Sequence, residues 1–213
     1  MRTHPPRPVV GFDLDMTLVN SAAGIAATVQ AALAEVGRVA TAEQLWPLVG
    51  VPMQATLAEV APGVDIEAVT LRYRALYPTH GIGPITLLPG ATEAIDAVHA
   101  AAGRALVVSA KVVQAVQAVL AHVGLDRGPH AVDEVVGGLF GEHKGGALRA
   151  LGAHVYVGDH PGDVAAARAA GAVSVAVATG PHDAARLAEC GADVVLADLT
   201  TFPVWLADFV RQM

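Results

Sequence analysis

The chain has 213 residues, enough for one α/β domain with a small insertion but too few for two large domains. It carries 13 Lys and Arg against 20 Asp and Glu, and this net charge of −7 without a basic run argues against nucleic acid or an anionic membrane as a partner. No apolar run is long enough to span a membrane. Residues 1–8 lack the cleavage site of a secretory signal, and the single Cys190 excludes an internal disulfide. We therefore expect a cytoplasmic protein.

The first apolar segment, residues 8–12, is predicted to be a strand, and the long stretch after it contains no convincing strand. Gly37 is placed to end a helix there, and Thr41 with Gln44 forms a capping box before a second helix. Residues 65–77 are predicted to form a further helix. The first helix has four apolar residues on one face, namely Ile25, Val29, Leu33 and Val36. We predict an all-helical unit over residues 20–85, inserted into a core made of residues 1–19 and 86–213.

From residue 86 onward, short β-branched runs alternate with Ala-rich helical stretches. The predicted strands are residues 105–109, 134–137, 155–158, 174–178 and 193–196. The predicted helices are residues 91–102, 112–123, 145–151, 163–170, 184–189 and 200–211. Several of these strands lack polar alternation, which indicates burial on both faces of a parallel sheet. The pattern predicts a doubly wound, Rossmann-like α/β core.

Two carboxylates, Asp13 and Asp15, come directly after the first predicted strand. An open parallel sheet binds its ligands at this position, beyond the carboxyl ends of its strands. Because like charges repel, we expect that a divalent cation is bound there or that one carboxyl group keeps its proton. Either arrangement is useful for catalysis.

A second pair of carboxylates, Asp159 and Asp163, follows the predicted strand 155–158. An aspartate at a strand-to-helix junction is often only a helix cap, so this pair alone is weak evidence of a site. Ser109 ends another predicted strand, and Lys144 stands at the start of a predicted helix. Taken singly, the serine is typical of a turn residue and the lysine of a solvated surface residue. Their order along the chain between the two carboxylate pairs favours a shared site.

This set of residues resembles the four motifs of the haloacid dehalogenase superfamily, and in particular its phosphoglycolate phosphatase-like group with a small helical cap. The resemblance implies that Asp13 is the nucleophile, that Asp15 is the general acid and base, and that Lys144 is the third catalytic residue. It also implies that Mg²⁺ is held by Asp13, Asp15 through its backbone carbonyl, Asp159 and Asp163. The implied phosphate-binding positions are Thr17, Ser109 and Ala110.

The sequence departs from the family pattern at three positions in or next to these motifs. Met16 stands where glycine is common and forgoes its freedom at positive φ, Ala110 replaces a common Asn, and His160 replaces a small hydroxyl residue. In the cap, residues 49–53 resemble a substrate-facing loop. Arg72 and Arg74 cannot share a helix face, so at most one is expected to face the site, and a solvated surface position is favoured for both.

The resemblance favours a Mg²⁺-dependent phosphatase that acts on a small phosphorylated metabolite, such as phosphoglycolate, a sugar phosphate or a nucleotide. A phosphomutase is an alternative in the same superfamily, since an aspartyl phosphate can also pass to a second hydroxyl group. A phosphoaccepting signalling module is a third possibility, because such domains also gather acidic residues and a lysine around Mg²⁺. The sequence does not decide between a monomer and a homodimer.

Overall fold

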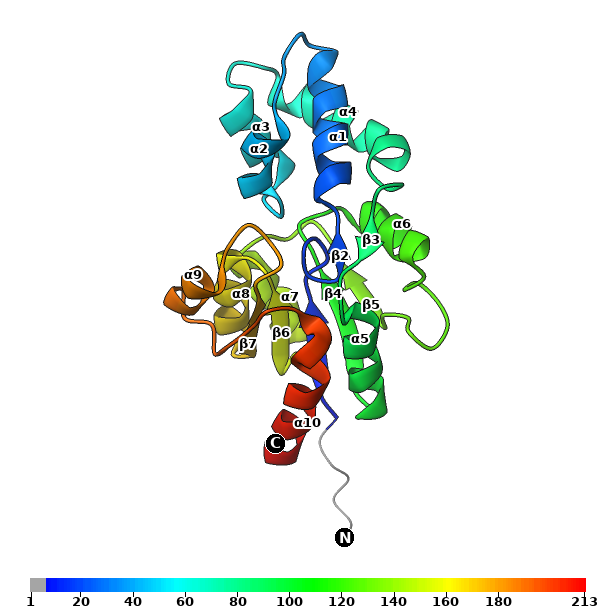
Figure 1. Ribbon diagram of the computed structural model, residues 1–213, viewed down its shortest axis with the longest axis vertical. Helices are drawn as coiled ribbons and strands as arrows, with labels where there is room; N and C mark the ends of the chain where they lie inside the picture. Colours follow the sequence, from blue (N-terminus) through cyan, green and yellow to red (C-terminus); the bar gives the residue numbers. More distant parts are fainter. Residues whose placement is uncertain (1–6) are drawn as a thin grey trace.

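The computed structural model describes residues 7–213, so most of the segment on which the absence of a secretory signal was judged lies outside the described residues. The centre of the molecule is a six-stranded parallel sheet with the order β5-β4-β1-β6-β7-β8 (Figure 1). The strands are β1 (Val9–Phe12), β4 (Arg104–Val108), β5 (Glu134–Val136), β6 (Val155–Gly158), β7 (Val173–Val177) and β8 (Val194–Leu196). In β1, Phe12 lies beside Val107 of β4 and Val157 of β6, which places β1 between the two.

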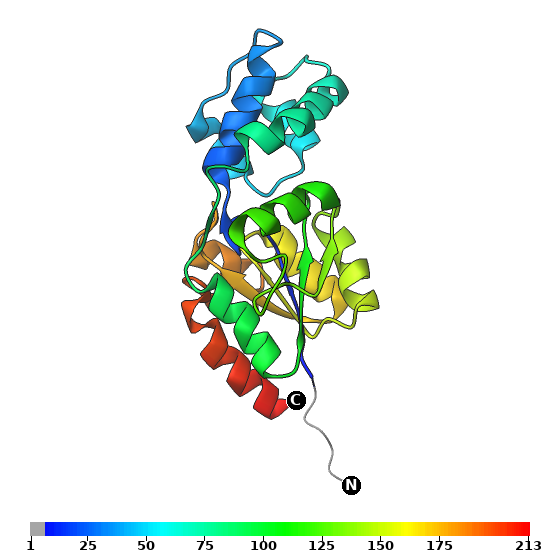
Figure 2. The ribbon, with the colours of Figure 1, turned by 90° about the vertical axis from the view of Figure 1, so that its right-hand side faces the viewer.

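Helices cover both faces of this sheet, and each face has its own apolar layer (Figure 2). Phe12 belongs to the larger core, together with side chains of α5, α6 and α10. Tyr156 belongs to a smaller core with Leu148 of α7 and Ala166 of α8. The helices are α5 (Ala91–Ala100), α6 (Val113–Val123), α7 (Glu142–Ala150), α8 (Pro161–Ala170), α9 (Ala184–Glu189) and α10 (Phe202–Gln212). The doubly wound α/β core predicted from the sequence is confirmed.

Four helices form a separate group beyond the carboxyl end of the sheet, at the top of Figure 1. They are α1 (Ala22–Ala34), α2 (Ala42–Leu45), α3 (Met53–Val60) and α4 (Ile66–His80). We call this group the helical unit. The antiparallel strands β2 (Val19–Asn20) and β3 (Thr86–Leu87) lead into and out of it. The capping box of Thr41 and Gln44 is present, whereas the division of the chain into two domains stays a prediction.

One local prediction was wrong, and three short elements were missed. Helix α1 ends at Ala34, so Val36 is not on its buried face and is 48% exposed. Helix α3 was not predicted, because an eight-residue helix that starts after Pro52 has little room to display a period. The strands β2 and β3 have two residues each, too few for an alternating pattern.

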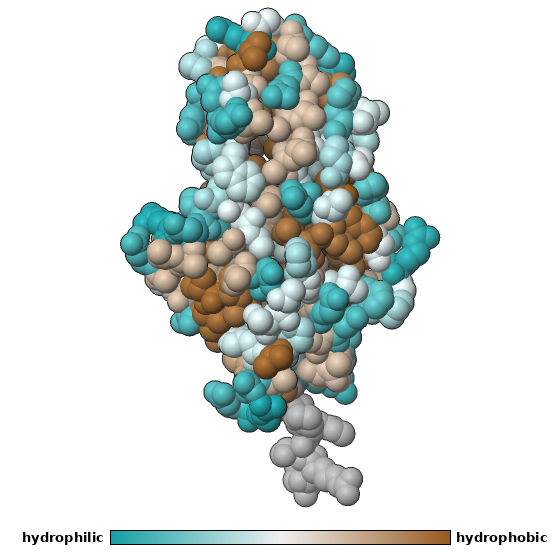
Figure 3. Space-filling model, in the orientation of Figure 1, coloured by the Kyte–Doolittle hydropathy of each residue, from teal (hydrophilic) through white to brown (hydrophobic). Residues whose placement is uncertain are grey.

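The surface in Figure 3 shows the helical unit as an upper lobe on a wider body, with hydrophilic side chains along the edges of both. Within residues 7–213, no helix combines the length and the apolar composition that crossing a membrane requires.

Candidate active site

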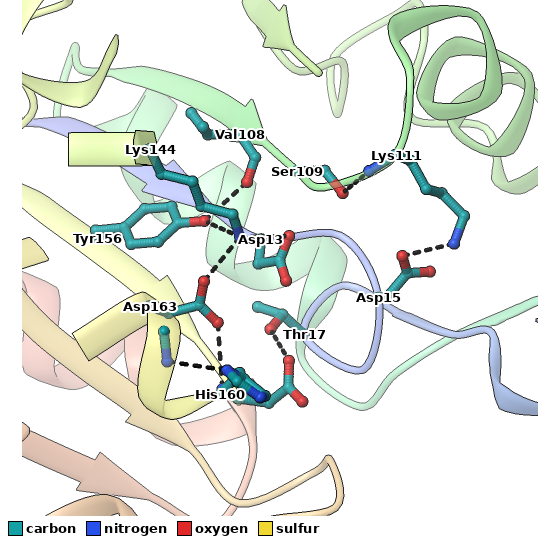
Figure 4. A network of polar contacts seen from close by, with 12 residues as sticks. Asp13, Asp15, Thr17, Val108, Ser109, Lys111, Lys144, Tyr156, His160 and Asp163 are labelled. Carbon is teal, nitrogen blue, oxygen red and sulfur yellow. Dashed lines mark hydrogen bonds and ion pairs between the residues drawn. The ribbon is translucent and has the colours of Figure 1, made fainter. Parts of the chain in front are cut away.

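The ends of three neighbouring strands bring the predicted site residues together (Figure 4). Asp13 directly follows β1, Ser109 follows β4, and Asp159 follows β6. The backbone N–H of Asp13 donates a hydrogen bond to the carbonyl of Val157, at 2.8 Å, which extends the pairing of β1 and β6 by one residue. The chain therefore turns away from the sheet only after Asp13 is in place.

Asp13, Asp159 and Asp163 form a cluster of buried carboxylates. One oxygen of each lies within 4.8 Å of the others. Asp163 reaches the cluster from the first turn of α8, where it also accepts a hydrogen bond from the backbone N–H of His160. Asp163 thus makes the contact of a helix cap and also lies in the carboxylate cluster, while its role as a site residue stays a prediction.

Lys144 is the cation of this cluster, and it is only 2% exposed. Its Nζ lies 2.8 Å from Asp163 Oδ1 and 3.1 Å from Asp13 Oδ1. Lys144 Nζ also donates a hydrogen bond to Tyr156 Oη, at 2.9 Å, and the Tyr156 hydroxyl in turn donates to the carbonyl of Val108. The buried Tyr156, from the strand that precedes Asp159, thus fixes the direction of the lysine (Figure 4).

Burial raises the pKa of Asp13 to about 7, because the attraction of Lys144 only partly opposes it and the charges of Asp163 and Asp15 add repulsion. Burial also raises the pKa of Asp159 well above its ordinary value, with further repulsion from Asp163 and Asp13. For Lys144, burial disfavours the charged form, but attraction to Asp13 and Asp163 outweighs it and the net pKa is raised. The one positive charge of Lys144 therefore does not neutralise the three carboxylates of the cluster.

The surroundings of Asp159 and Asp163 fit a bound cation. Asp159 Oδ2 is buried and has no hydrogen-bond partner within residues 7–213, while its Oδ1 accepts a hydrogen bond from the Thr17 hydroxyl at 3.0 Å. A Cβ atom at Gly180 would overlap with Asp159, and one at Gly158 would overlap with Asp163, so glycine is needed to admit both carboxylates. An unpaired buried carboxylate oxygen is costly, and hard divalent cations prefer such ligands.

Asp15 is separate from the cluster although it is only two residues from Asp13. Its Oδ1 accepts a hydrogen bond from the Ser21 hydroxyl at 2.5 Å, and its Oδ2 lies 2.6 Å from Lys111 Nζ. The Asp15 side chain therefore does not join the predicted metal ligands, which leaves only its backbone carbonyl for that role. The two carboxylates have different environments, as different catalytic roles require.

Met16, directly after Asp15, lies in the left-handed region, with φ of 54°. Met16 thus adopts the conformation for which glycine is suited, at a cost in strain. Ser109 and Ala110 lie at the predicted edge of the sheet, and Ser109 Oγ accepts a hydrogen bond from the backbone N–H of Lys111, at 3.3 Å. His160 caps α8 through its ring nitrogen, which accepts from the N–H of Gly162.

The two cap arginines have different surroundings. Arg72 forms two hydrogen bonds with Glu35 on the surface, whereas Arg74, also exposed, lines a cavity beside Asp15. Sequence reasoning missed Ser21 and Tyr156 as parts of the site. Tyr156 has a sequence signal, because it occupies the strand face opposite to Val155 and Val157. Ser21 has none, because it follows a strand of only two residues.

Comparison with known proteins agrees with this geometry. The family model described as haloacid dehalogenase-like hydrolase matches residues 10–168, and a second, HAD-hydrolase-like model matches residues 138–202. The chain belongs to the haloacid dehalogenase-like hydrolase family. It is accordingly a hydrolase, as the sequence predicted, and it resembles the phosphoglycolate phosphatase-like members of that family.

Among curated proteins, a phosphoglycolate phosphatase of Haemophilus influenzae is 29% identical over 220 residues, which cover 89% of this chain and 94% of that protein. The tyrosine-protein kinase PtkA of Mycobacterium tuberculosis is 30% identical over 185 residues, which cover 81% of this chain and 62% of that protein.

Solved structures show the same fold. A haloacid dehalogenase-like family protein from Streptococcus pneumoniae superposes with a TM-score of 0.79 at 21% identity, covering 95% of this chain and 97% of its own. A hydrolase from Pseudomonas syringae gives 0.78 at 20% identity, covering 94% of this chain and 98% of its own. At such identities the likeness concerns the fold alone.

Proposed function

We propose that this hydrolase is a Mg²⁺-dependent phosphatase that cleaves the phosphate monoester of a small metabolite. One observation carries the proposal: Asp13 lies in a buried cluster with Lys144 and two further carboxylates, while Asp15 turns away from that cluster toward Lys111. A nucleophile held beside a cation site and a separate acid are the two groups that hydrolysis through a phosphoenzyme requires. Similarity to the phosphoglycolate phosphatase of Haemophilus influenzae supports the same class of reaction.

In the proposed reaction, a carboxylate oxygen of Asp13 attacks phosphorus and the bond to the ester oxygen breaks. Asp15 gives its proton to that oxygen, so the alcohol leaves neutral and Asp13 carries the phosphoryl group. Asp15 then takes a proton from water, which attacks phosphorus and releases inorganic phosphate with Asp13 restored. Lys111, at 2.6 Å from Asp15, holds this carboxyl group in place for both proton transfers.

The remaining residues position the phosphoryl group. Lys144 places a positive charge next to the attacking oxygen, and the hydroxyl groups of Thr17 and Ser109 and the backbone at Ala110 are proposed to donate hydrogen bonds to the phosphoryl oxygens. Asp13, Asp159, Asp163 and the backbone carbonyl of Asp15 would hold Mg²⁺. A bound cation supplies positive charge to the transferring group and compensates the excess of carboxylates.

The proposal is tested by phosphate release from a panel of phosphate monoesters, with Mg²⁺ and after thorough chelation. We expect inorganic phosphate to be released only with the cation present. Isomerised phosphate esters without free phosphate would instead indicate a mutase. Undiminished hydrolysis after chelation would contradict the cation requirement. The cytoplasmic location expected from the sequence belongs to this proposal and is tested by fractionation of cells.

A further inference from the structure

A cavity of about 320 Å³ lies between the helical unit and α6, with Asp15 and Lys111 in its lining. In Figure 2, α6 in green lies directly below the helical unit. The volume is at the lower end of the range typical of small-molecule sites. Apolar side chains from the helical unit form much of its wall, including Ile25, Leu48, Val51, Pro52, Met53 and Ile82.

The lining of the cavity is mostly apolar, and its polar groups are few. The charges of Asp15 and Lys111 are paired with each other at 2.6 Å. Arg74 also lines the cavity, but its side chain is exposed, so water can hydrate its charge. Tyr77 Oη is buried and has no hydrogen-bond partner within residues 7–213, so it can orient a ligand. The other polar side chains of the lining are Gln54, Tyr73 and Gln114.

Resting on the phosphatase function proposed above, we propose that the substrate is the phosphate ester of an alcohol larger than glycolate, with an apolar body that this cavity binds as the leaving group. Transfer of apolar surface from water into such walls is favourable. The cavity has room for about ten water-sized groups, more than glycolate can fill. An alcohol with an apolar body uses this volume, and the Tyr77 hydroxyl can accept or donate one hydrogen bond to it.

Glycolate itself matches the cavity poorly. Its carboxylate lies one carbon from the ester oxygen, so it must sit close to the group that protonates that oxygen, proposed to be Asp15. The cation at that place, Lys111, is already paired with Asp15. The glycolate carboxylate would then be buried against apolar side chains, which is costly.

The test compares three esters of primary alcohols with Mg²⁺ present: 2-phenylethyl phosphate, ethyl phosphate and 2-phosphoglycolate. We expect kcat/KM to be at least about tenfold higher for the phenylethyl ester than for either other ester, the scale of burying apolar groups in a fitted pocket. Equal or higher kcat/KM for 2-phosphoglycolate would overturn this inference and leave the phosphatase function intact.

Binding of phosphonates separates the two proposals, because these compounds are not hydrolysed. Calorimetry with Mg²⁺ should give at least about tenfold tighter binding for 3-phenylpropylphosphonate than for 3-phosphonopropionate. This ranking without phosphate release from any ester would support the pocket's preference and refute the phosphatase function. The reverse ranking would overturn the inference whatever the hydrolysis shows.

A matched pair of variants tests whether the apolar lining of the cavity contacts the leaving group. Val51→Thr puts a hydroxyl group into the lining at nearly constant volume, whereas Val39→Thr makes the same change at a side chain that is 84% exposed and outside the lining. We expect Val51→Thr to lower kcat/KM several-fold more for the phenylethyl ester than for ethyl phosphate, with no effect of Val39→Thr. A loss of the same size on both esters would mean that Val51 does not contact the leaving group.

Discussion

At the scale of single residues, the separate roles proposed for Asp13 and Asp15 rest on the different surroundings of their two carboxylates. Asp13 directly follows β1 and contacts Lys144, whereas the side chain of Asp15 contacts Ser21 and Lys111. Asp15→Asn should therefore slow turnover by about 10²–10⁴-fold, as expected when a general acid is lost.

Mg²⁺ affinity, measured by calorimetry, should change little in Asp15→Asn, because the backbone carbonyl is kept. Asp159→Asn is the matched comparison, since it removes a charge from the carboxylate cluster, and it should weaken Mg²⁺ binding together with activity. Equal loss of Mg²⁺ affinity in both variants would contradict the separation of the two carboxylate environments.

The hydroxyl group of Tyr156 accepts a hydrogen bond from Lys144, and this contact leads to a second prediction. Tyr156→Phe removes the hydroxyl group that joins Lys144 Nζ to the Val108 carbonyl, so two buried groups lose a partner. We expect a loss of stability of about 1–3 kcal/mol in urea unfolding, together with a lower kcat. Tyr73→Phe, at a buried tyrosine of the helical unit that does not contact Lys144, is the control and should cost less stability in urea unfolding. An unchanged kcat in Tyr156→Phe would show that Lys144 needs no such support.

At the scale of elements, the close approach of α1 to the end of α4 depends on glycine. A Cβ atom at Gly24 would overlap with the backbone carbonyl of Gly81, which cannot move away like a flexible side chain. Gly24→Ala should thus destabilise the protein by more than about 1 kcal/mol despite alanine's higher helix propensity. Gly146 in α7 faces open space, so Gly146→Ala should stabilise the protein by about 0.5–1 kcal/mol. Changes of the same sign in thermal unfolding of the two variants would refute this account.

The elements also show what the sequence could predict. The strands of the sheet were predictable because each is an apolar run bounded by turn residues, and the site residues Asp13, Ser109 and Asp159 were predictable because each ends such a run. Helix α3 and the strands β2 and β3 were not, since short elements stabilised by tertiary contacts carry no period. The ion pair of Asp15 with Lys111 was not predictable either, because the two residues follow different strands and only the fold brings them together.

At the scale of the whole molecule, the acidic cluster links stability to pH and to the cation. Because the pKa of Asp13 is raised to about 7 and that of Asp159 is also raised, the folded protein without a cation binds protons that the unfolded chain has released. These groups therefore lower the free energy of unfolding as the pH rises from about 4 toward 7. A cation binds best to the deprotonated cluster, so its stabilising effect should grow over the same range.

We accordingly expect Mg²⁺ to raise the unfolding midpoint more at pH 8 than at pH 5.5, relative to protein with chelator at the same pH. This difference between the two pH values should be smaller in Asp159→Asn, which keeps Asp13 but removes one carboxylate whose pKa is raised. An equal shift by Mg²⁺ at both pH values would mean that the cluster does not release protons on binding the cation.

The central claim, that Asp13 carries the phosphoryl group during turnover, is tested most directly by trapping the phosphoenzyme. Protein mixed with a cleaved substrate and Mg²⁺ is quenched in acid within milliseconds, and its peptides are analysed by mass spectrometry after borohydride reduction of the acyl phosphate. The account predicts modification at Asp13 alone and none in Asp13→Asn, which should also lack turnover. Modification at another residue, or near-normal turnover by Asp13→Asn, would contradict it.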